Sequence, residues 1–332
     1  MKEVKTVEAF LFALNAVAPI MLMTIIGYVL NRTGLIKDNF ASGLNKLVFK
    51  LFLPAMLFLN VYNIKESDSL DITYIFYVLL IIVAVFLVSI PLVILITKNN
   101  SRRGALLQAT FRSNFALIGI PVGEALFGAT GALVATLLSA AIIPVYNVLG
   151  VISLSLFNGS KKPSVKKILL DIIKNPLIES IALGFLCLAF RSFFLHFNIA
   201  FRLDQITPLM KTLEYLSGVA TPLALVSLGA GFRFSAIKEL RREIIFGVIM
   251  RVVIVPFIGI GVAYMIKNHF WDAHFAAFVA VFATPVAVST VPMAEAMGSD
   301  SSLAGQLVIW STLFSSLSIF VASYLLKLLG IF

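Results

Sequence analysis

The sequence predicts an all-α polytopic membrane protein with ten transmembrane helices, arranged as two inverted repeats of five helices whose broken fourth and ninth helices cross. Three observations lead to this fold class. The 332 residues are 60% hydrophobic and only 13% charged. Apolar runs near the length of a membrane span recur along the whole chain, and one segment of the first half returns in the second. This composition is typical of helices that cross a bilayer.

Ten apolar runs are candidate spans, and the connections between them are short. In order they are 9–30, 39–62, 72–97, 105–127, 130–157, 176–195, 206–232, 243–266, 273–297 and 303–329. The longest connection, 158–175, is too short for a folded domain. We therefore expect a first five-helix repeat over 1–157, a basic cytoplasmic linker over 158–175 and a second, inverted repeat over 176–332.

The basic residues predict the orientation of the chain. The formal net charge is +10, and in a membrane protein such a surplus marks cytoplasmic loops rather than a nucleic-acid partner. Fourteen Lys and Arg residues fall in the loops of one side, against about seven on the other. The side with fourteen basic residues is expected to be cytoplasmic, which places both termini on the extracellular side of the cell membrane. The single cysteine, Cys187, excludes an intramolecular disulfide.

An internal repeat points to the functional region. FRSNFALIGIPVGEA (111–125) aligns without gaps with FATPVAVSTVPMAEA (282–296), and five of the fifteen positions are identical. A weaker match joins 52–58 to 220–226 through Pro54 and Pro222. A repeat with an odd number of spans is inverted relative to the first copy. Inverted repeats with Gly/Pro-interrupted helices at matching positions are typical of secondary transporters.

The prolines of the repeat predict where the two helices break. We expect interruptions near Gly119–Pro121 and Thr290–Pro292, because a proline removes a backbone hydrogen bond and clashes with the preceding turn. The freed backbone groups must line a polar cavity, where the half-helices offer N–H groups to an anion. A proline kink filled by packing alone is the alternative, and the matched pair favours a site.

Charged residues within the predicted spans have either a structural or a functional role. Glu124 and Glu295 follow the prolines by three residues, and either compensate a helix dipole or titrate and couple transport to protons. Lys50, at mid-depth of the second span, is expected to contact substrate or a gate. Arg112 is either a substrate cation or a partner for a helix C-terminus, and Arg251 is expected to snorkel to the membrane surface. No metal or nucleophile constellation is present, so neither a cofactor nor an enzyme is predicted.

Three segments resemble the auxin efflux carrier family, which includes bacterial malate and malonate permease-like proteins and plant auxin exporters. They are SGLNKLVFKLFLPAMLF (42–58), SNFALIGIP (113–121) and PVAVSTVPMAEAMGSD (285–300). The resemblance implies a scaffold part (spans 1, 2, 6 and 7), a transport part (spans 3–5 and 8–10), a substrate site at the crossing of spans four and nine, and a homodimer.

Individual residues follow from this resemblance. Asn114 falls where the plant carriers place an amide that contacts the substrate carboxylate, and Pro121 falls on the crossover proline of the fourth span. Pro292 is shifted from the plant pattern, which leaves Thr284, Ser289 and Thr290 as the nearby polar groups. Lys50 also departs from the pattern, since an uncharged residue is expected there. These departures count against the plant substrate.

The predicted function is a secondary transporter that moves a small organic anion, a mono- or dicarboxylate, by alternating access. Protons and sodium are the candidate coupling ions, and the bilayer and a second copy of the chain are the expected partners. A cation/proton antiporter of related fold is one alternative, although such proteins generally carry paired acidic residues at the crossing. A non-transporting membrane receptor is another, and an intramembrane enzyme would need catalytic groups that the spans lack.

Overall fold

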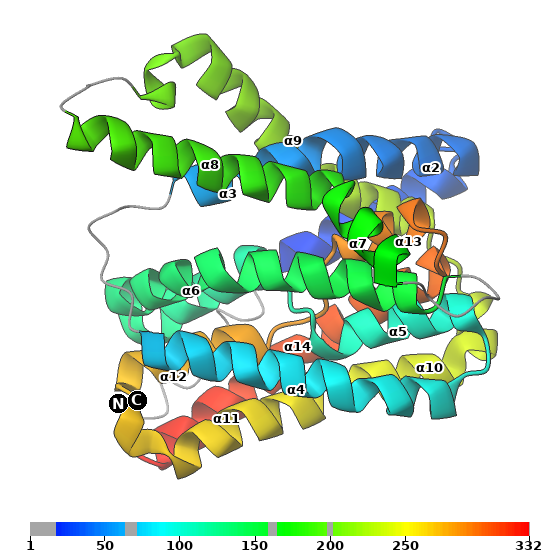
Figure 1. Ribbon diagram of the computed structural model, residues 1–332. Helices are drawn as coiled ribbons and strands as arrows, with labels where there is room; N and C mark the ends of the chain where they lie inside the picture. Colours follow the sequence, from blue (N-terminus) through cyan, green and yellow to red (C-terminus); the bar gives the residue numbers. More distant parts are fainter. Residues whose placement is uncertain (1–17, 64–71, 159–164, 198–201, 332) are drawn as a thin grey trace.

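The computed structural model describes residues 18–63, 72–158, 165–197 and 202–331, and every regular element within these ranges is a helix (Figure 1). Most of the long helices lie side by side along one direction. Six helical segments are long and apolar enough to cross a membrane, namely Asn39–Tyr62, Ile72–Ile96, Leu117–Leu156, Thr207–Ala230, Ala236–Met265 and Ser301–Leu328. A multi-pass helical membrane protein is therefore confirmed.

The helices of the first half follow the predicted order. A helix over Ala18–Arg32 precedes α2 (Asp38–Leu47), a π-helical turn η1 (Val48–Phe52) and α3 (Leu53–Tyr62), which together form one continuous rod. The remaining elements are α4 (Ile72–Ile96), α5 (Asn100–Phe111), a π-helical turn η2 (Phe115–Gly119) and α6 (Ile120–Leu156). Within α6 the backbone bends at Phe127 and Gly128, where Gly128 has a φ of 60°. This bend separates the fourth predicted span from the fifth.

The second half begins with a helix in the expected linker. This helix, α7 (Val165–Ile173), is tied to α6 because the Ser155 hydroxyl donates to Asp171 at 2.8 Å. The longer elements that follow are α8 (Pro176–His196), α9 (Thr207–Ala230), α10 (Ala236–Ile249), π-helical η4 (Met250–Ile254), α11 (Val255–Met265), α12 (Asp272–Phe282), α13 (Thr290–Ala296) and α14 (Ser301–Leu328). Two short 3₁₀ turns, η3 (Leu203–Gln205) and η5 (Lys267–His269), precede α9 and α12.

Each of the three π-helical turns ends two residues before a proline. The prolines are Pro54, Pro121 and Pro256, and each occupies the first turn of the α-helix that follows. A proline cannot donate to the carbonyl four residues earlier, and its ring clashes with that carbonyl in a regular α-helix. The wider π-turn accommodates the clash without ending the helix. Pro121 therefore does not break the helix, and the prediction of an interruption at Gly119–Pro121 is wrong.

Gly119 has a packing role in this arrangement. A Cβ added to it would lie 2.9 Å from the carbonyl oxygen of Ala280 in α12 and 2.5 Å from the Phe115 ring. The glycine thus lets η2 approach the backbone of α12 closely.

The real interruptions lie at 112–114, between α5 and η2, and at 283–289, between α12 and α13. The second interruption ends just before Thr290, so the expected region is correct there although Pro292 does not cause the break. Pro292 lies in the first turn of α13, where backbone N–H groups have no partner within the helix and the missing donor costs little. Both helices that carry the internal repeat are therefore broken, as predicted.

The two interruptions cross and bond to each other. The backbone N–H of Asn114 donates to the carbonyl of Pro285 at 2.7 Å, and the N–H of Ala287 donates to the carbonyl of Arg112 at 3.2 Å. Ser113 and Val286 form an antiparallel bridge between these bonds. The segments thus satisfy each other's backbone groups in a region where lipid could not.

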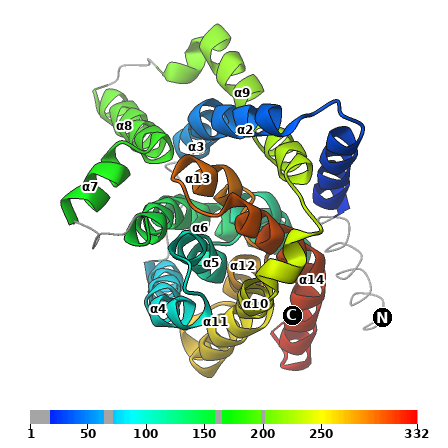
Figure 2. The same ribbon diagram turned by 90° about the vertical axis from the view of Figure 1, so that its right-hand side faces the viewer.

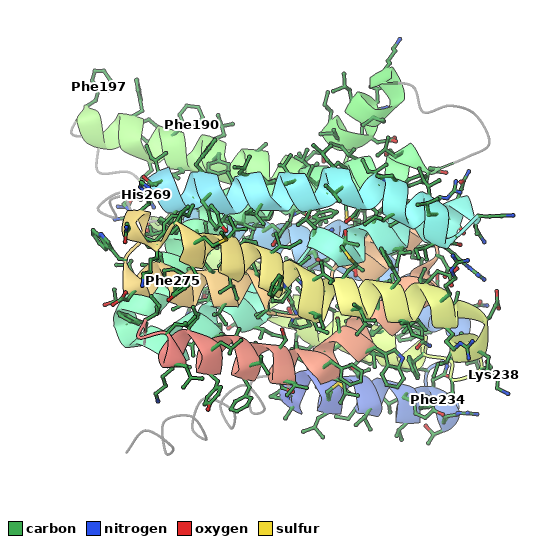
Figure 3. All side chains as sticks on the ribbon, turned by 90° about the horizontal axis from the view of Figure 1, so that it is seen from below. Phe190, Phe197, Phe234, Lys238, His269 and Phe275 are labelled. Atoms are coloured by element: carbon green, nitrogen blue, oxygen red, sulfur yellow. The ribbon has the colours of Figure 1, made fainter. Side chains whose placement is uncertain are left out.

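The helices form two groups (Figure 2). In one group α3 packs against α8 and α9, and in the other α12 packs against α6 while α14 packs against α10. The crossing lies in the second group and faces α3 and α9 of the first. Figure 3 shows Lys238 at one end of the bundle and His269 at the opposite end.

Candidate functional site

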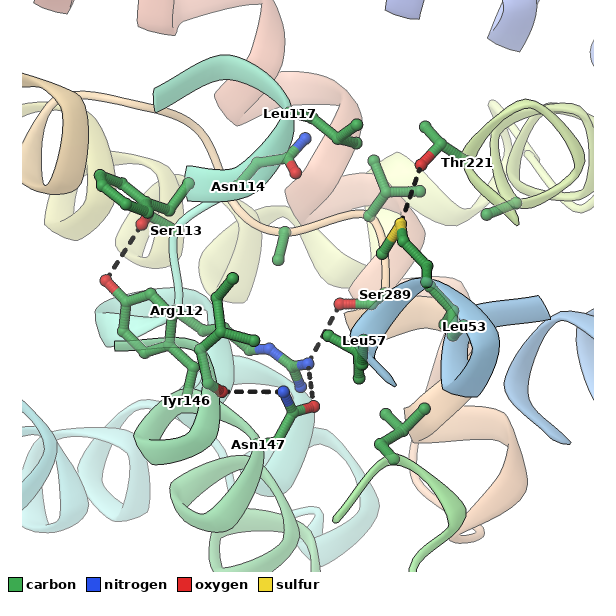
Figure 4. A pocket seen from close by; sticks show the side chains of 17 residues that line it. Leu53, Leu57, Arg112, Ser113, Asn114, Leu117, Tyr146, Asn147, Thr221 and Ser289 are labelled. Carbon is green, nitrogen blue, oxygen red and sulfur yellow. Dashed lines mark hydrogen bonds between the residues drawn. The ribbon is translucent and has the colours of Figure 1, made fainter. Parts of the chain in front are cut away.

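A cavity of about 60 Å³ opens where the crossing faces the first group of helices (Figure 4). Its polar wall consists of Arg112, Ser113, Asn114, Tyr146, Asn147 and Ser289, and its apolar wall includes Leu53, Met56 and Leu57 of α3. Thr221 and Ala224 of α9 line the same wall. Most of the polar groups therefore come from the broken helices and α6, whereas the lining from α3 and α9 is apolar except for Thr221. A cavity of this size holds several waters or a small organic molecule.

Arg112 is the only charged side chain that lines this cavity among the described residues, and only 3% of its surface is exposed. Its Nη1 donates to Oε1 of Gln108 at 3.1 Å and to the sulfur of Met293. Its Nη2 donates to Oδ1 of Asn147 at 2.9 Å and to Oγ of Ser289 at 3.1 Å. The guanidinium is thus held by α5, α6, the 283–289 segment and α13 together.

No carboxylate lies within ion-pair distance of Arg112 in the described part of the chain. Burying an ion costs several kcal/mol after relaxation, and neutral hydrogen-bond acceptors recover only part of this. An arginine side chain is not deprotonated in proteins, so the guanidinium remains charged. The cavity therefore has a positive charge that an anion could neutralise.

Asn114 lines the same cavity and carries a hydrogen-bond donor without a partner in the described part of the chain. Its side chain is 5% exposed, and its Nδ2 is buried without a hydrogen-bond partner among the described residues. An unsatisfied buried donor costs about 1–3 kcal/mol, so its retention needs a reason. Asn114 is also the residue from which η2 starts. A ligand with acceptor oxygens would satisfy the amide.

Gly150 makes room for the arginine. A Cβ at this position would lie 2.8 Å from Nη1 of Arg112 and 3.2 Å from Cε of Met293. Ser113 and Tyr146 close another side of the cavity, where their hydroxyls lie 3.0 Å apart. The guanidinium is therefore confined by packing as well as by hydrogen bonds.

Arg251 connects the two interruptions through hydrogen bonds and does not line the cavity. It is fully buried, and it donates from Nε to the carbonyl of Thr284 at 2.7 Å. Its Nη1 reaches the carbonyl of Phe111 at 3.3 Å, and its Nη2 reaches those of Val281 at 2.5 Å and Phe282 at 3.3 Å. The ends of α5 and α12 carry the negative ends of their helix dipoles, which a cation stabilises. The expectation that Arg251 snorkels is therefore wrong.

The other predicted substrate residues divide into two sets. Ser289 lines the cavity and bonds Arg112, as described above. Thr284 and Thr290 are buried, but their hydroxyls bond the carbonyls of Ala280 and Ala287 at 2.7 Å and lie outside the cavity. The contact with substrate that was expected of Thr284 and Thr290 is therefore not seen, because hydroxyls next to a helix end bond the local backbone instead.

Lys50 does not reach the cavity. It lies in η1 with its side chain exposed on the outside of the bundle. The predicted substrate role is therefore dropped. The residue falls on the outer face because the π-turn changes the rotation of the helix relative to a regular α-helix.

The two carboxylates of the repeat occupy different environments. Glu124 is exposed near the bend at Phe127, well past the interruption at 112–114. Glu295 is partly buried in a second cavity of about 190 Å³, where it accepts from Oγ of Ser42 at 2.5 Å and from Nδ2 of Asn45 at 2.6 Å. These bonds join α13 to α2. The expectation that both carboxylates lie in the first turn after a break is therefore wrong for Glu124.

Sequence reasoning missed Gln108, Tyr146 and Asn147. Gln108 precedes Arg112 by one helical turn, a spacing that places two side chains on one face. Tyr146 and Asn147 are adjacent polar residues within the apolar run of the fifth span, and polar residues in a span usually face the interior of the bundle. Both signals were available in the sequence. In the described residues no group of three or more His, Cys, Asp or Glu side chains could hold a metal ion.

Two broken helices that cross inside a multi-pass helical bundle, around a buried cation, define the class of membrane transport proteins. The chain belongs to the family described as membrane transport protein, whose model matches residues 12–323. The resemblance to the auxin efflux carriers and to malonate permease-like proteins is thereby confirmed.

Two curated relatives are named as transporters, and a third is matched over a shorter stretch. An uncharacterized transporter of Methanothermobacter thermautotrophicus is 24% identical over 326 residues, which cover 93% of this chain and 97% of the relative. An uncharacterized transporter of Methanocaldococcus jannaschii is 26% identical over 233 residues, covering 68% and 70% of the two chains. The mouse lysosomal cholesterol signaling protein is 33% identical over 108 residues, which are 31% of this chain and 12% of that protein.

Proposed function

We propose that the protein is a secondary transporter that moves a small mono- or dicarboxylate across the cell membrane by alternating access. One observation carries the proposal: Arg112 is a buried cation in a cavity and has no carboxylate partner in the described part of the chain. A carboxylate substrate would supply the missing charge. Because the guanidinium is planar, it can bind both oxygens of a carboxylate at once.

The surroundings of Arg112 support the same substrate class. The Nδ2 of Asn114 is an unused donor on the wall of the same cavity. The start of η2 adds the positive end of a helix dipole, which favours an anion. The apolar wall of Leu53, Met56 and Leu57 suits the carbon skeleton of a small acid and limits its size. Recognition would thus combine one charge, one amide and a narrow apolar wall.

Ten segments would cross the membrane in this proposal. Besides the six long segments, they include Ala18–Arg32, α8 and the two broken helices, with α6 divided at Phe127–Gly128. The antiparallel pairing of 112–114 with 283–289 supports inverted repeats over 1–157 and 176–332, connected by 158–175. Movement of the crossing past α3 and α9 would expose the cavity to each side in turn. A homodimer remains part of the proposal.

The basic end of the bundle is proposed to face the cytoplasm, with both termini outside. Lys238 lies at that end (Figure 3), and Arg241 and Arg242 follow it in α10. Arg102 and Arg103 lie in the first turn of α5, where Arg102 pairs with Glu239 of α10. The positive-inside rule assigns this end to the cytoplasm.

Glu295 is the proposed coupling residue. Its hydrogen bonds to Ser42 and Asn45 join α13 of the crossing to α2 of the other group of helices. An ionised carboxylate accepts from both donors, whereas a protonated one has less acceptor capacity and holds the two elements less firmly. Proton binding would therefore release α13 for movement. Glu124 has no such connection and is proposed as a surface residue.

Two alternatives make different predictions. A cation/proton antiporter would need acidic groups at the crossing, but the charged group that lines the cavity in the described residues is an arginine. A non-transporting receptor is the second candidate, and the partial match to a protein named for cholesterol signaling favours testing it. A receptor would bind its ligand without net flux.

Uptake into proteoliposomes tests the proposal. Purified protein would be reconstituted and offered radiolabelled acetate, lactate, malonate and malate, with a matched organic cation as control. Each would be measured in counterflow, and then with an imposed pH or sodium gradient. Saturable counterflow of at least one carboxylate is expected. Cation flux alone would favour the antiporter, and binding without counterflow would favour the receptor.

A further inference from the structure

A third cavity, with two arginines at one end, lies on the lipid-facing side of α10, away from the crossing. Its volume is about 620 Å³, and its apolar wall includes Ile96 at the end of α4 and Ile245, Ile249 and Ile254 along α10 and η4. Arg241 and Arg242 complete the lining. Ile245 and Ile249 are 52% and 46% exposed on the described chain, so this groove faces the bilayer.

The acidic and the basic side chains of α10 have different surroundings. Glu239 and Glu243 both pair with Arg102 of α5, so the acidic side chains are engaged on the side toward the bundle. Arg241 and Arg242 line the groove instead, and no carboxylate of the described residues lies within ion-pair distance of either. Arg242 donates from Nη2 to the carbonyl of Leu95 at 3.3 Å, which fixes it at the end of α4. Two guanidinium groups therefore stand together without a counter-ion at the head of an apolar groove.

The length of the groove matches one leaflet of a membrane. From Arg241 to Ile254 the helix advances roughly 20 Å at 1.5 Å per residue. One leaflet with its headgroup region is about half of a bilayer that is roughly 40–45 Å thick. A free phosphate would use the arginines and leave the apolar wall uncovered. A molecule with a negative headgroup and acyl chains would cover both.

We propose that this groove binds one anionic phospholipid, with its phosphate at Arg241 and Arg242 and an acyl chain along Ile245, Ile249 and Ile254. Basic pockets at the cytoplasmic ends of membrane helices are suited to such headgroups. The lipid would also connect the end of α4 to α10 and η4, the element that carries Arg251. The site is separate from the carboxylate cavity and does not depend on the proposed transport activity.

Lipid titration with matched variants tests this site. Delipidated protein in detergent would be titrated with dioleoylphosphatidylglycerol or dioleoylphosphatidylcholine, with bound lipid counted by native mass spectrometry and thermal stability followed by intrinsic fluorescence. Arg241→Gln/Arg242→Gln should lower the affinity for one phosphatidylglycerol by about 25-fold, since each basic residue near a membrane surface contributes roughly fivefold. Affinity for phosphatidylcholine should change much less.

Two further variants separate the site from general surface charge. Arg32→Gln/Lys37→Gln removes the same charge from two exposed positions, the last residue of the helix Ala18–Arg32 and the loop after it, and should leave phosphatidylglycerol binding unchanged. Ile249→Trp keeps the charge, fills the groove and should lower retention of the lipid. An equal loss in the Arg32/Lys37 variant, or an unaltered affinity in the Arg241/Arg242 variant, would overturn the proposal. So would equal protection by inorganic phosphate, or a dimer that Arg241→Gln/Arg242→Gln dissociates without any loss of lipid.

Discussion

The Nε of Arg251 lies 2.7 Å from the carbonyl oxygen of Thr284, and Nη1 of the same guanidinium lies 3.3 Å from the carbonyl oxygen of Phe111. Thr284 belongs to one interruption, and Phe111 is the last residue before the other. One side chain of η4 thus satisfies the exposed carbonyls of two helices that would otherwise end inside the membrane without partners.

Replacing this arginine should destabilise the protein. Arg251→Gln removes most of the donors to four carbonyls, and each unsatisfied buried group costs about 1–3 kcal/mol. We expect a clear fall of the apparent melting temperature in detergent and poor recovery as a monodisperse species. Lys238→Gln, at an exposed position of α10, is the control and should have the melting temperature of the wild type. A variant of Arg251 as stable as the wild type would show that water can replace the guanidinium there.

Asn114 should contribute to transport without contributing to stability. Because Nδ2 of Asn114 has no partner among the described residues, Asn114→Ala removes an unsatisfied donor and should leave the melting temperature unchanged or slightly raised. The same variant should lower carboxylate uptake, since the substrate loses a hydrogen bond worth about 1.5–3 kcal/mol to a charged acceptor. Normal uptake by a well-folded variant would remove Asn114 from the site. A fall in stability would assign it a structural role.

Gly150 should tune the affinity for substrate through the position of Arg112. A methyl group at Gly150 would lie 2.8 Å from Nη1, so Gly150→Ala must displace the guanidinium. We expect a raised KM for the carboxylate and protein that still folds. Gly218→Ala in α9 is the matched control, because a Cβ there meets no atom within 4 Å and alanine favours the helix. An equal KM for the carboxylate in the Gly150→Ala and Gly218→Ala variants would contradict a role of Arg112 in binding the substrate.

Coupling to protons should depend on Glu295 and not on Glu124. Glu295→Gln keeps the size of the side chain but fixes it in an uncharged form, so the bonds to Ser42 and Asn45 no longer respond to pH. Substrate exchange should persist, whereas accumulation driven by a pH gradient should be lost. Glu124→Gln removes a charge from the other half of the repeat and should accumulate substrate as the wild type does. Gradient-driven accumulation by both variants would leave neither carboxylate a coupling role.

The sequence located the crossing but not the position of its first break. The match between 111–125 and 282–296 identified the two helices because both copies carry the same pattern of small, polar and proline residues. The first break was expected at Pro121 because a proline was taken to end a helix, whereas the π-turn before it absorbs the clash. The actual break depends on Arg251, whose partners lie in two other helices. Such a tertiary contact leaves no local pattern.

The same limit explains why the sequence predicts a substrate contact for Lys50 as well as for Arg112. Both are cations within apolar runs, and the runs alone did not determine which face of each helix is buried. The structure turns Lys50 outward and surrounds Arg112 with Gln108, Asn147 and Ser289. Gln108, one turn before Arg112, is an uncharged polar residue in an apolar run and is the available sign that this face is buried. The residue one turn before Lys50 is another lysine, Lys46, and both lysines are exposed.

The most direct test of the central claim is carboxylate counterflow by Arg112→Gln in proteoliposomes. Before the assay, the variant must match the wild type in monodispersity and melting temperature, and Arg112→Lys provides a charged second variant that lacks the planar fork. We predict that Arg112→Gln abolishes counterflow of every carboxylate that the wild type moves, and that Arg112→Lys retains part of it with a raised KM. Wild-type counterflow by folded Arg112→Gln would contradict an anion site built on this arginine.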